Sequence, residues 1–169
     1  MIRVFAAARR PAQPASDQGI LGAKTHVESG SARVSSVTED PEHSPRRLKV
    51  AQFTDNYGPG SNGLMFAVQQ LEGNLLDAGH EVVVVAPKAK GPNPHLGREG
   101  RVEVRLPSVR VPNMPTRVAN GRHFERTIEQ VGQLDPDVIH VHGLGTVGVL
   151  GTWAAKRLNK PMLMTWHTD

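Results

Sequence analysis

The sequence predicts an α/β fold, with a doubly wound, mainly parallel and Rossmann-like sheet over residues 48–169. Short apolar segments alternate there with longer segments whose apolar residues recur every three or four positions, which is the pattern of strand–helix–strand units. The segment Glu81–Ala86 contains four consecutive valines, as is typical of a strand buried on both faces of a parallel sheet. We expect the crossovers between parallel strands to be right-handed.

The first half of this region begins with a strand over Lys49–Thr54. The helix that follows ends at Gly79, because glycine is a common helix stop. Its apolar stripe consists of Leu64, Val68, Leu71, Leu75 and Ala78. After the valine-rich strand, a weaker third strand covers Arg101–Leu106.

The second half repeats the alternation. A second helix carries Phe124, Ile128, Val131 and Leu134, and an Asp-Pro-Asp turn leads to a strand at Val138–Val141. A third helix carries Val147, Leu150, Ala154 and Leu158, and Pro161 separates it from a last strand at Met162–Trp166. Ligands of such sheets gather beyond the carboxyl ends of the strands, so we expect functional residues within 54–63, 86–90, 142–145 and 166–169.

Residues 1–47 differ in composition from the rest. Leu, Ile, Val and Phe make up 8 of these 47 residues but 33 of the 122 that follow, and the first share is below the roughly 20% that accompanies a packed core. We therefore expect 1–47 to be a disordered N-terminal extension and 48–169 to be the folded domain. Five acidic residues in the extension argue against a transit peptide.

Composition and charge exclude several classes of function. The absence of cysteine excludes disulfides, thiolate zinc sites and cysteine catalysis. Without a secretory leader or an apolar run near the roughly 18 residues of a membrane span, the chain is expected to be soluble and cytoplasmic. Nine basic and three acidic residues lie between Lys88 and Arg126. This basic segment is either a solvated face or a peripheral contact with anionic lipid at the inner face of the membrane, and its lack of interleaved aromatics argues against nucleic acid.

A glycine-rich loop joins the first strand to the first helix. Residues 58–63 read Gly-Pro-Gly-Ser-Asn-Gly, and free N–H groups at a helix start attract phosphate. One interpretation is an anion-facing loop, and a second is a plain turn in which Ser61 or Asn62 caps the helix. The third, a dinucleotide fingerprint, is disfavoured because the turn comes late after the strand and no acidic residue ends the second strand.

Four motifs in order resemble family 4 glycosyltransferases of the GT-B fold. Phe53–Leu64 is similar to the family's opening loop, Thr-Asp-x-Tyr-x-Pro-x-x-(Gly or Asn)-Gly-(Val or Leu). The resemblance continues through Ala78–Val82 and Pro136–His142 and closes on Thr165–Asp169, so that it covers essentially all of 48–169. It implies the N-terminal, acceptor-side domain, which is one half of a GT-B architecture.

The resemblance also implies a reaction and its site residues. The enzyme would transfer a hexose such as mannose or glucose, with retention, from a nucleotide-diphosphate sugar to a sugar or lipid-linked acceptor, without a metal or other cofactor. The loop would stabilise the negative charge on the departing diphosphate; its residues are Gly60, Ser61, Asn62 and Gly63. His167 matches the family histidine that touches the transferred sugar, and Tyr57 and His142 are candidate acceptor contacts.

The histidines also allow simpler interpretations. His140 and His142 lie two apart on one strand and project to the same face of the sheet. A metal site that adds His167 and Asp169 is disfavoured, because no further strand-borne ligand supports it. We expect His140 to be packed and hydrogen-bonded, while His142 and His167 keep both a structural and a ligand-contacting interpretation.

The family's second domain binds most of the nucleotide sugar, and its hallmark pair of glutamates, seven residues apart, has no counterpart here. We therefore expect a truncated enzyme that is inactive without its C-terminal domain. Two other classes stay open at this point. One is an NAD(P)-binding oxidoreductase domain, and the other is a non-catalytic module that binds a sugar or a protein partner.

Overall fold

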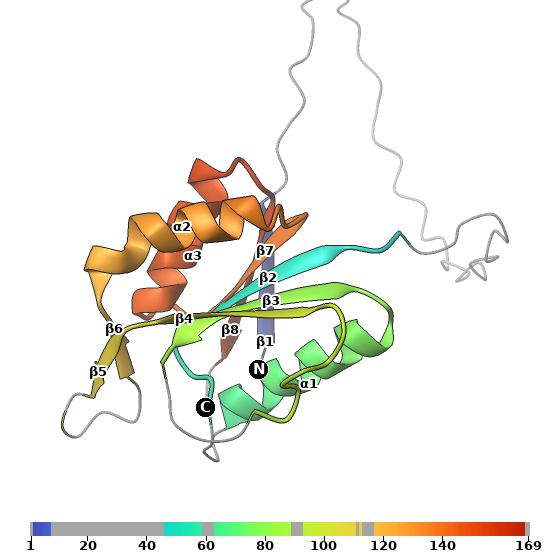
Figure 1. Cartoon of the computed structure of the whole chain (residues 1–169), viewed down its shortest axis with the longest axis horizontal. Coiled ribbons are helices and arrows are strands. Elements are labelled where there is room, and N and C mark those ends of the chain that lie inside the picture. The colour runs from blue at the N-terminus through green and yellow to red at the C-terminus, as the bar shows by residue number, and fades with distance from the viewer. Residues whose placement is uncertain are drawn as a thin grey trace, which may run out of the picture. The chain divides into compact units, whose positions relative to one another are not determined.

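The computed structural model describes residues 2–7, 46–58, 63–88, 93–110, 112 and 117–167. Its elements follow one another along the chain as in Figure 1: β1 (Ile2–Ala7), β2 (Lys49–Thr54), α1 (Gly63–Asp77), β3 (Glu81–Pro87), β4 (Arg101–Leu106), β5 (Ser108–Arg110), β6 (Arg117–Ala119), the 3-10 turn η1 (Gly121–His123), α2 (Phe124–Gln133), β7 (Val138–His142), α3 (Thr146–Arg157) and β8 (Met162–His167). Every strand and helix expected from 48 onward is present, with bounds within a few residues of the expected ones.

The strands of the main sheet run in the order β1-β8-β7-β2-β3-β4. The five strands from β8 to β4 are parallel to one another. Counted along the chain, these five stand in the order fifth, fourth, first, second and third, which is the Rossmann order. The doubly wound, mainly parallel fold is thereby confirmed. The order of the strands reverses between β2 and β7, where such sheets bind their ligands.

Helices cover both faces of the sheet (Figure 1). On one face α2 and α3 pack on the sheet through a core that includes Phe53, Ile139 and Leu150, all fully buried. On the other face Val68 of α1 packs against Val82 and Val84 of β3. The alternation of side chains along a strand explains this division, because neighbouring residues point to opposite faces.

The strand β1 differs from the sequence prediction. It lies within 1–47, which we expected to be disordered, and pairs antiparallel with β8 over a register from Ile2 and His167 to Ala7 and Met162. The edge of β8 carries backbone N–H and C=O groups that a further strand can pair, and Ile2–Ala7 has one charged residue in six. The composition of the whole extension concealed this short apolar segment. Residues 8–45 lie outside the described part of the chain.

A short hairpin was not predicted either. Strands β5 and β6 pair antiparallel with Val109 opposite Val118. The hairpin follows β4 and precedes η1 and α2, so it lies within the segment between Lys88 and Arg126 that the sequence marked as basic. Its strands have three residues each, too few to show a clear period-2 pattern.

Candidate functional site

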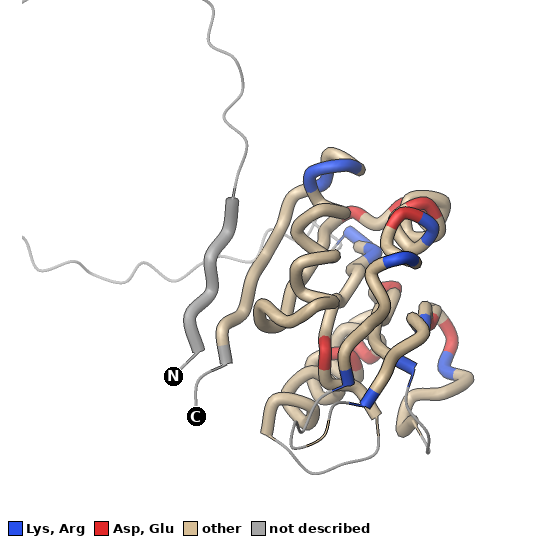
Figure 2. Tube along the Cα trace, turned by 90° about the vertical axis from the view of Figure 1, so that its left-hand side faces the viewer, with Lys and Arg blue, Asp and Glu red and all other residues tan. Residues whose placement is uncertain are grey.

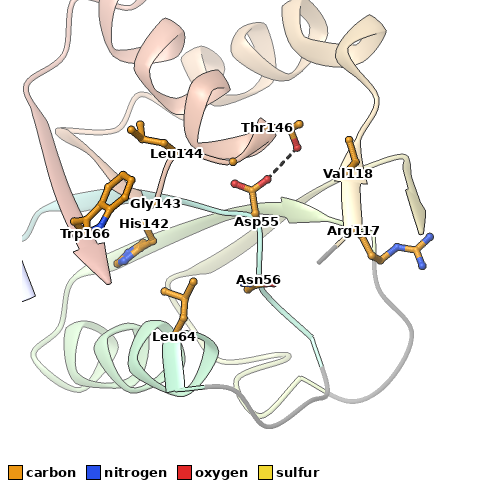
Figure 3. Close-up of a pocket in the computed structure, with 11 residues that line it drawn as sticks. Asp55, Asn56, Leu64, Arg117, Val118, His142, Gly143, Leu144, Thr146 and Trp166 are labelled. Atoms are coloured by element: carbon orange, nitrogen blue, oxygen red, sulfur yellow. Dashed lines mark hydrogen bonds between the residues drawn. The ribbon is translucent and has the colours of Figure 1, made fainter. Parts of the chain in front are cut away.

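A pocket of about 410 Å³ lies beyond the carboxyl ends of β2, β7 and β8 (Figure 3). Its walls come from the loop after β2 (Asp55 and Asn56), the start of α1 (Leu64), β6 (Arg117 and Val118), the stretch from the end of β7 to the start of α3 (residues 142–146) and Trp166 of β8. The pocket therefore occupies the switch point of the sheet, as expected from the topology. Three of the four expected strand ends line it, whereas 86–90 contributes none of its described residues.

Asp55 caps the N-terminus of α3. Its Oδ1 accepts hydrogen bonds from the Val147 backbone N–H at 2.8 Å and from Thr146 Oγ1 at 2.9 Å. Its Oδ2 accepts from the Gly148 backbone N–H at 3.2 Å. A carboxylate at this position satisfies free N–H groups and interacts favourably with the helix dipole. The Asp55 carboxylate thus occupies the N-terminus of α3, where an anion would otherwise bind. The N-terminus of α1 is the other helix start at the pocket.

The loop between β7 and α3 depends on glycine. Gly143 has a φ of +85°, a left-handed conformation that glycine adopts without strain. A Cβ on Gly145 would overlap the Asp55 carboxylate, and a Cβ on Gly148 would overlap the carbonyl oxygen of Gly143. The Asp55 side chain can therefore approach α3 only with glycine at 145, and the turn from β7 into α3 needs glycine at 148.

Thr146 extends this arrangement to the hairpin. Its Oγ1 accepts a hydrogen bond from the Ala119 backbone N–H of β6 at 3.1 Å while it donates to Asp55. The pocket walls formed by 55–56, 117–118 and 143–146 are thus connected through one hydroxyl group and one carboxylate.

Tyr57 belongs to a buried network beneath the start of the glycine-rich loop. Its side chain is 3% exposed, and its hydroxyl donates to Glu72 of α1. Arg101 of β4 donates from Nε to the same carboxylate at 2.5 Å, and Arg105 donates from Nη1 to the Tyr57 carbonyl oxygen at 2.7 Å. Tyr57 is not among the residues that line the pocket, and its network anchors the loop after β2. The role of Tyr57 as an acceptor contact stays a prediction.

The network shifts the ionisation of its members. Burial raises the pKa of the Tyr57 phenol, and the hydrogen bond to Glu72 raises it further. Burial alone would also raise the pKa of Glu103, but hydrogen bonds from Arg101 and Arg105 hold it below its ordinary value of 4.5. Paired and hydrogen-bonded charges of this kind are tolerated inside a protein, whereas isolated ones are not.

The basic segment between Lys88 and Arg126 is less basic on the surface than its composition indicates. The Arg101 side chain is 3% exposed and pairs with Glu72 and Glu103, and Arg98 pairs with Asp77 at 2.5 Å. Figure 2 shows Lys and Arg positions interspersed with Asp and Glu positions over the described residues. Among the described basic residues of this segment, Lys88, Arg110, Arg122 and Arg126 are exposed.

The structure places the two predicted strand histidines differently. His140 is 5% exposed, and its Nε2 lies 2.8 Å from Thr165 Oγ1, which confirms the expected packed and hydrogen-bonded residue. His142 lies in the pocket wall, 2% exposed, with its ring centroid 4.0 Å from that of His140. Its role as an acceptor contact stays a prediction.

The remaining predicted residues concern the glycine-rich loop and His167. Gly60, Ser61 and Asn62 lie outside the described residues. Gly63 is the first residue of α1, and a Cβ built on it meets no atom within 4 Å from the described residues beyond its chain neighbours and the helix backbone. His167 is the last residue of β8, at the carboxyl end expected for it. The roles of these residues stay predictions.

Sequence reasoning included Asp55 and Trp166 in the strand ends expected to carry function but gave neither a role, and it missed Arg117 and Thr146 as pocket residues. Asp55 directly follows a strand, and the sequence Gly-Leu-Gly-Thr at 143–146 precedes a helix. Both are signals of helix capping, but only the fold shows that the two segments meet.

Comparison with known proteins places the chain in a family. Residues 62–169 match the family described as "Glycosyl transferase 4-like domain". The chain belongs to this family. The resemblance found in the sequence is thereby confirmed, and a glycosyltransferase domain is favoured over an oxidoreductase or a non-catalytic module.

Several curated proteins are similar in sequence to this glycosyl transferase 4-like domain. The chain is 30% identical over 122 residues to the alpha-monoglucosyldiacylglycerol synthase of Streptococcus pneumoniae, and the match covers 72% of this chain and 27% of that protein. It is 31% identical over 124 residues to a GDP-mannose-dependent alpha-mannosyltransferase of Mycolicibacterium smegmatis, covering 72% and 33%. It is 34% identical over 106 residues to the GDP-mannose-dependent alpha-(1-6)-phosphatidylinositol dimannoside mannosyltransferase of Mycobacterium tuberculosis, covering 63% and 27%. The matches thus span between 27% and 33% of the length of these relatives.

Proposed function

We propose that this domain is the acceptor-side half of a retaining hexosyltransferase that uses a nucleotide-diphosphate sugar. The observation that carries the proposal is the pocket at the switch point, in a chain that belongs to the glycosyl transferase 4-like family. The named relatives transfer mannose from GDP-mannose or make a glucosyl lipid. Mannose or glucose is therefore the proposed sugar.

The donor diphosphate is proposed to contact the glycine-rich loop, without a metal. Asp55 occupies the first N–H groups of α3, which leaves the start of α1 as the helix terminus suited to an anion. A Cβ on Gly63 would meet no atom within 4 Å from the described residues outside its own chain neighbours and helix backbone, which supports space for a ligand beside the backbone. Backbone N–H groups there would stabilise the charge that develops on the leaving diphosphate.

The acceptor is proposed to be a sugar or a lipid-linked sugar at the same pocket. None of the described helices is long and apolar enough to cross a membrane. Contact with a lipid-linked acceptor would therefore use the surface, and the exposed cations Lys88, Arg110, Arg122 and Arg126 provide a weak attraction to anionic lipid. A cytoplasmic location at the inner face of the membrane is part of this proposal.

A chimeric enzyme tests the proposed function. Residues 48–169 would replace the matching N-terminal part of the Mycolicibacterium smegmatis mannosyltransferase, which retains its own donor-binding half. We expect transfer of radiolabelled mannose from GDP-mannose to a lipid extract, with retention at the anomeric carbon. A chimera that folds and binds GDP-mannose but transfers nothing would contradict the proposal.

The glycine-rich loop offers a variant for the same assay. Gly63→Val should abolish transfer, because a β-branched side chain at the start of α1 fills the space needed for backbone approach. Gly121→Val serves as the matched control, since a Cβ on Gly121 also meets no atom within 4 Å from the described residues beyond its chain neighbours, but Gly121 lies in η1 rather than at the start of α1. Equal loss of transfer in both variants would show that the assay reports folding instead of ligand contact.

A further inference from the structure

Trp166 is exposed inside a concave site. It lines the pocket and is 40% exposed, and Leu144, which lines it too, is 50% exposed. The other of the two tryptophans, Trp153, is 54% exposed and packs edge-to-face on Phe124 with centroids 6.0 Å apart, and it is not among the residues that line the pocket. Large apolar side chains that remain exposed within a pocket mark a place for a ligand.

Backbone contacts hold this apolar wall in place. The neighbouring residue Thr165 pairs with His142 across β7 and β8, and its carbonyl oxygen accepts a hydrogen bond from the Gly143 N–H at 3.2 Å. Trp166 and Leu144 are therefore both attached to backbone segments that are bonded to each other. Figure 3 shows their side chains on the same side of the pocket.

The facing wall is polar and carries little free charge. It contains Asp55, Asn56 and Thr146, but the Asp55 carboxylate already accepts three hydrogen bonds from the start of α3. The cation that lines the pocket among the described residues, Arg117, donates from Nε and Nη2 to Ser108 at 2.8 and 2.9 Å, and its guanidinium points away from the other labelled side chains in Figure 3. The pocket thus presents Trp166 and Leu144, with His142 beside them, on one side, and on the other side the polar groups of Asp55, Asn56 and Thr146, with Asp55 and Arg117 already hydrogen-bonded within the protein.

A pyranose ring has the matching chemistry, because one face presents C–H groups while the hydroxyls lie around the edge. We propose that Trp166 is the platform on which an uncharged sugar ring of the acceptor stacks, with Leu144 beside it and the polar wall facing the hydroxyl groups. This inference rests on the proposed function and assigns a residue that contacts the acceptor. An aromatic platform binds an apolar face at small entropic cost, because the tryptophan side chain has only two rotatable bonds.

Nuclear magnetic resonance of the full chain tests the platform without requiring catalysis. The two indole N–H signals are assigned with the Trp153→Phe variant, and the probes are methyl α-mannopyranoside and methyl α-glucopyranoside at millimolar concentrations. We expect a saturable shift of the Trp166 signal by at least one glycoside, with the Trp153 signal unmoved. An unmoved Trp166 signal, or one that responds to octanol and not to either glycoside, overturns the proposal and, in the second case, indicates an acyl chain as the occupant.

Variants separate stacking from folding. Trp166→Ala should weaken glycoside binding by about tenfold or more, and Trp166→Phe should weaken it less, because a smaller aromatic face remains. Leu144→Ala, at an exposed loop position, provides a second test if Trp166→Ala does not fold, and it should weaken binding a few-fold. Unchanged affinity in all folded variants overturns the proposal. Binding on Trp166 together with an inactive chimera would refute the transferase and leave the sugar site in place.

Discussion

Asp55 and Thr146 lie 91 residues apart in the chain, and the Thr146 hydroxyl donates a 2.9 Å hydrogen bond to Oδ1 of Asp55. The same hydroxyl accepts from the backbone N–H of Ala119, and the same carboxylate accepts from the first N–H groups of α3. One pair of side chains therefore fixes the loop after β2, the loop after β7 and the hairpin β5–β6 around the pocket.

Replacing Thr146 with valine tests this connection. The substitution keeps the shape but removes the hydroxyl, so that Asp55 and the Ala119 N–H each lose a partner. We expect the free energy of unfolding to fall by about 1–3 kcal/mol in urea denaturation, the range for leaving polar groups unsatisfied. Thr146→Ser, which keeps the hydroxyl, should lose much less.

A second threonine on the same helix provides the matched control. The Thr152 hydroxyl donates to the Val149 carbonyl oxygen within α3, so the bond that it makes among the described residues stays inside one helix. Thr152→Val should therefore leave stability nearly unchanged. If Thr146→Val and Thr152→Val destabilise the chain equally, the connection through Asp55 contributes nothing.

Gly151 is expected to be intolerant of even one methyl group. It is buried in α3, and a Cβ there would lie 2.8 Å from Phe53 Cγ and 2.8 Å from Val141 Cγ2. Alanine is the better helix former by about 1 kcal/mol, but overpacking a core costs about 1–3 kcal/mol. We expect Gly151→Ala to lower the melting temperature, and an unchanged or raised value would mean that α3 moves away from the sheet without cost.

Alkaline pH should destabilise the chain through Tyr57. Burial and the hydrogen bond to Glu72 raise the pKa of the folded phenol above its ordinary value of 10.0. As pH rises above that value the unfolded phenol loses its proton while the folded one keeps it, so stability falls. Tyr57→Phe removes this titration, and urea midpoints measured across the alkaline range should show a shallower decline than in the original chain.

Wild type and variant share all other titrating groups, lysines included, so the difference between the two curves isolates the phenol. Parallel declines of the two curves would contradict the raised pKa.

The sequence predicted the elements whose signals are local. The apolar stripe of α1 and the valine run of β3 follow from side-chain periodicity within one segment, and the structure confirms both. Arg101 was counted with a basic surface segment because its partner, Glu72, lies 29 residues away and no local pattern links them. The pairing of β1 with β8, across nearly the whole chain, depends on a sheet edge that exists only after folding. The cap that Asp55 forms on α3 has the same origin.

His140 of β7 and His167 of the neighbouring strand β8 should respond differently to replacement by alanine. His140 is buried, bonded to Thr165 and in contact with the His142 ring. His140→Ala should therefore lower the free energy of unfolding by about 1–3 kcal/mol, with a smaller effect on the turnover of the molecules that remain folded.

His167→Ala should have the opposite effect in the chimeric enzyme. His167 is the last residue of β8, and we propose that it contacts the transferred sugar. Removing one polar contact that acts in the transition state typically lowers the rate by about a hundredfold, while the end of a strand tolerates truncation. Turnover with GDP-mannose and the melting temperature, measured for both variants, separate the two roles. Near-normal turnover in His167→Ala, combined with lost turnover at unchanged stability in His140→Ala, would reverse the assignment and make His140 the functional residue.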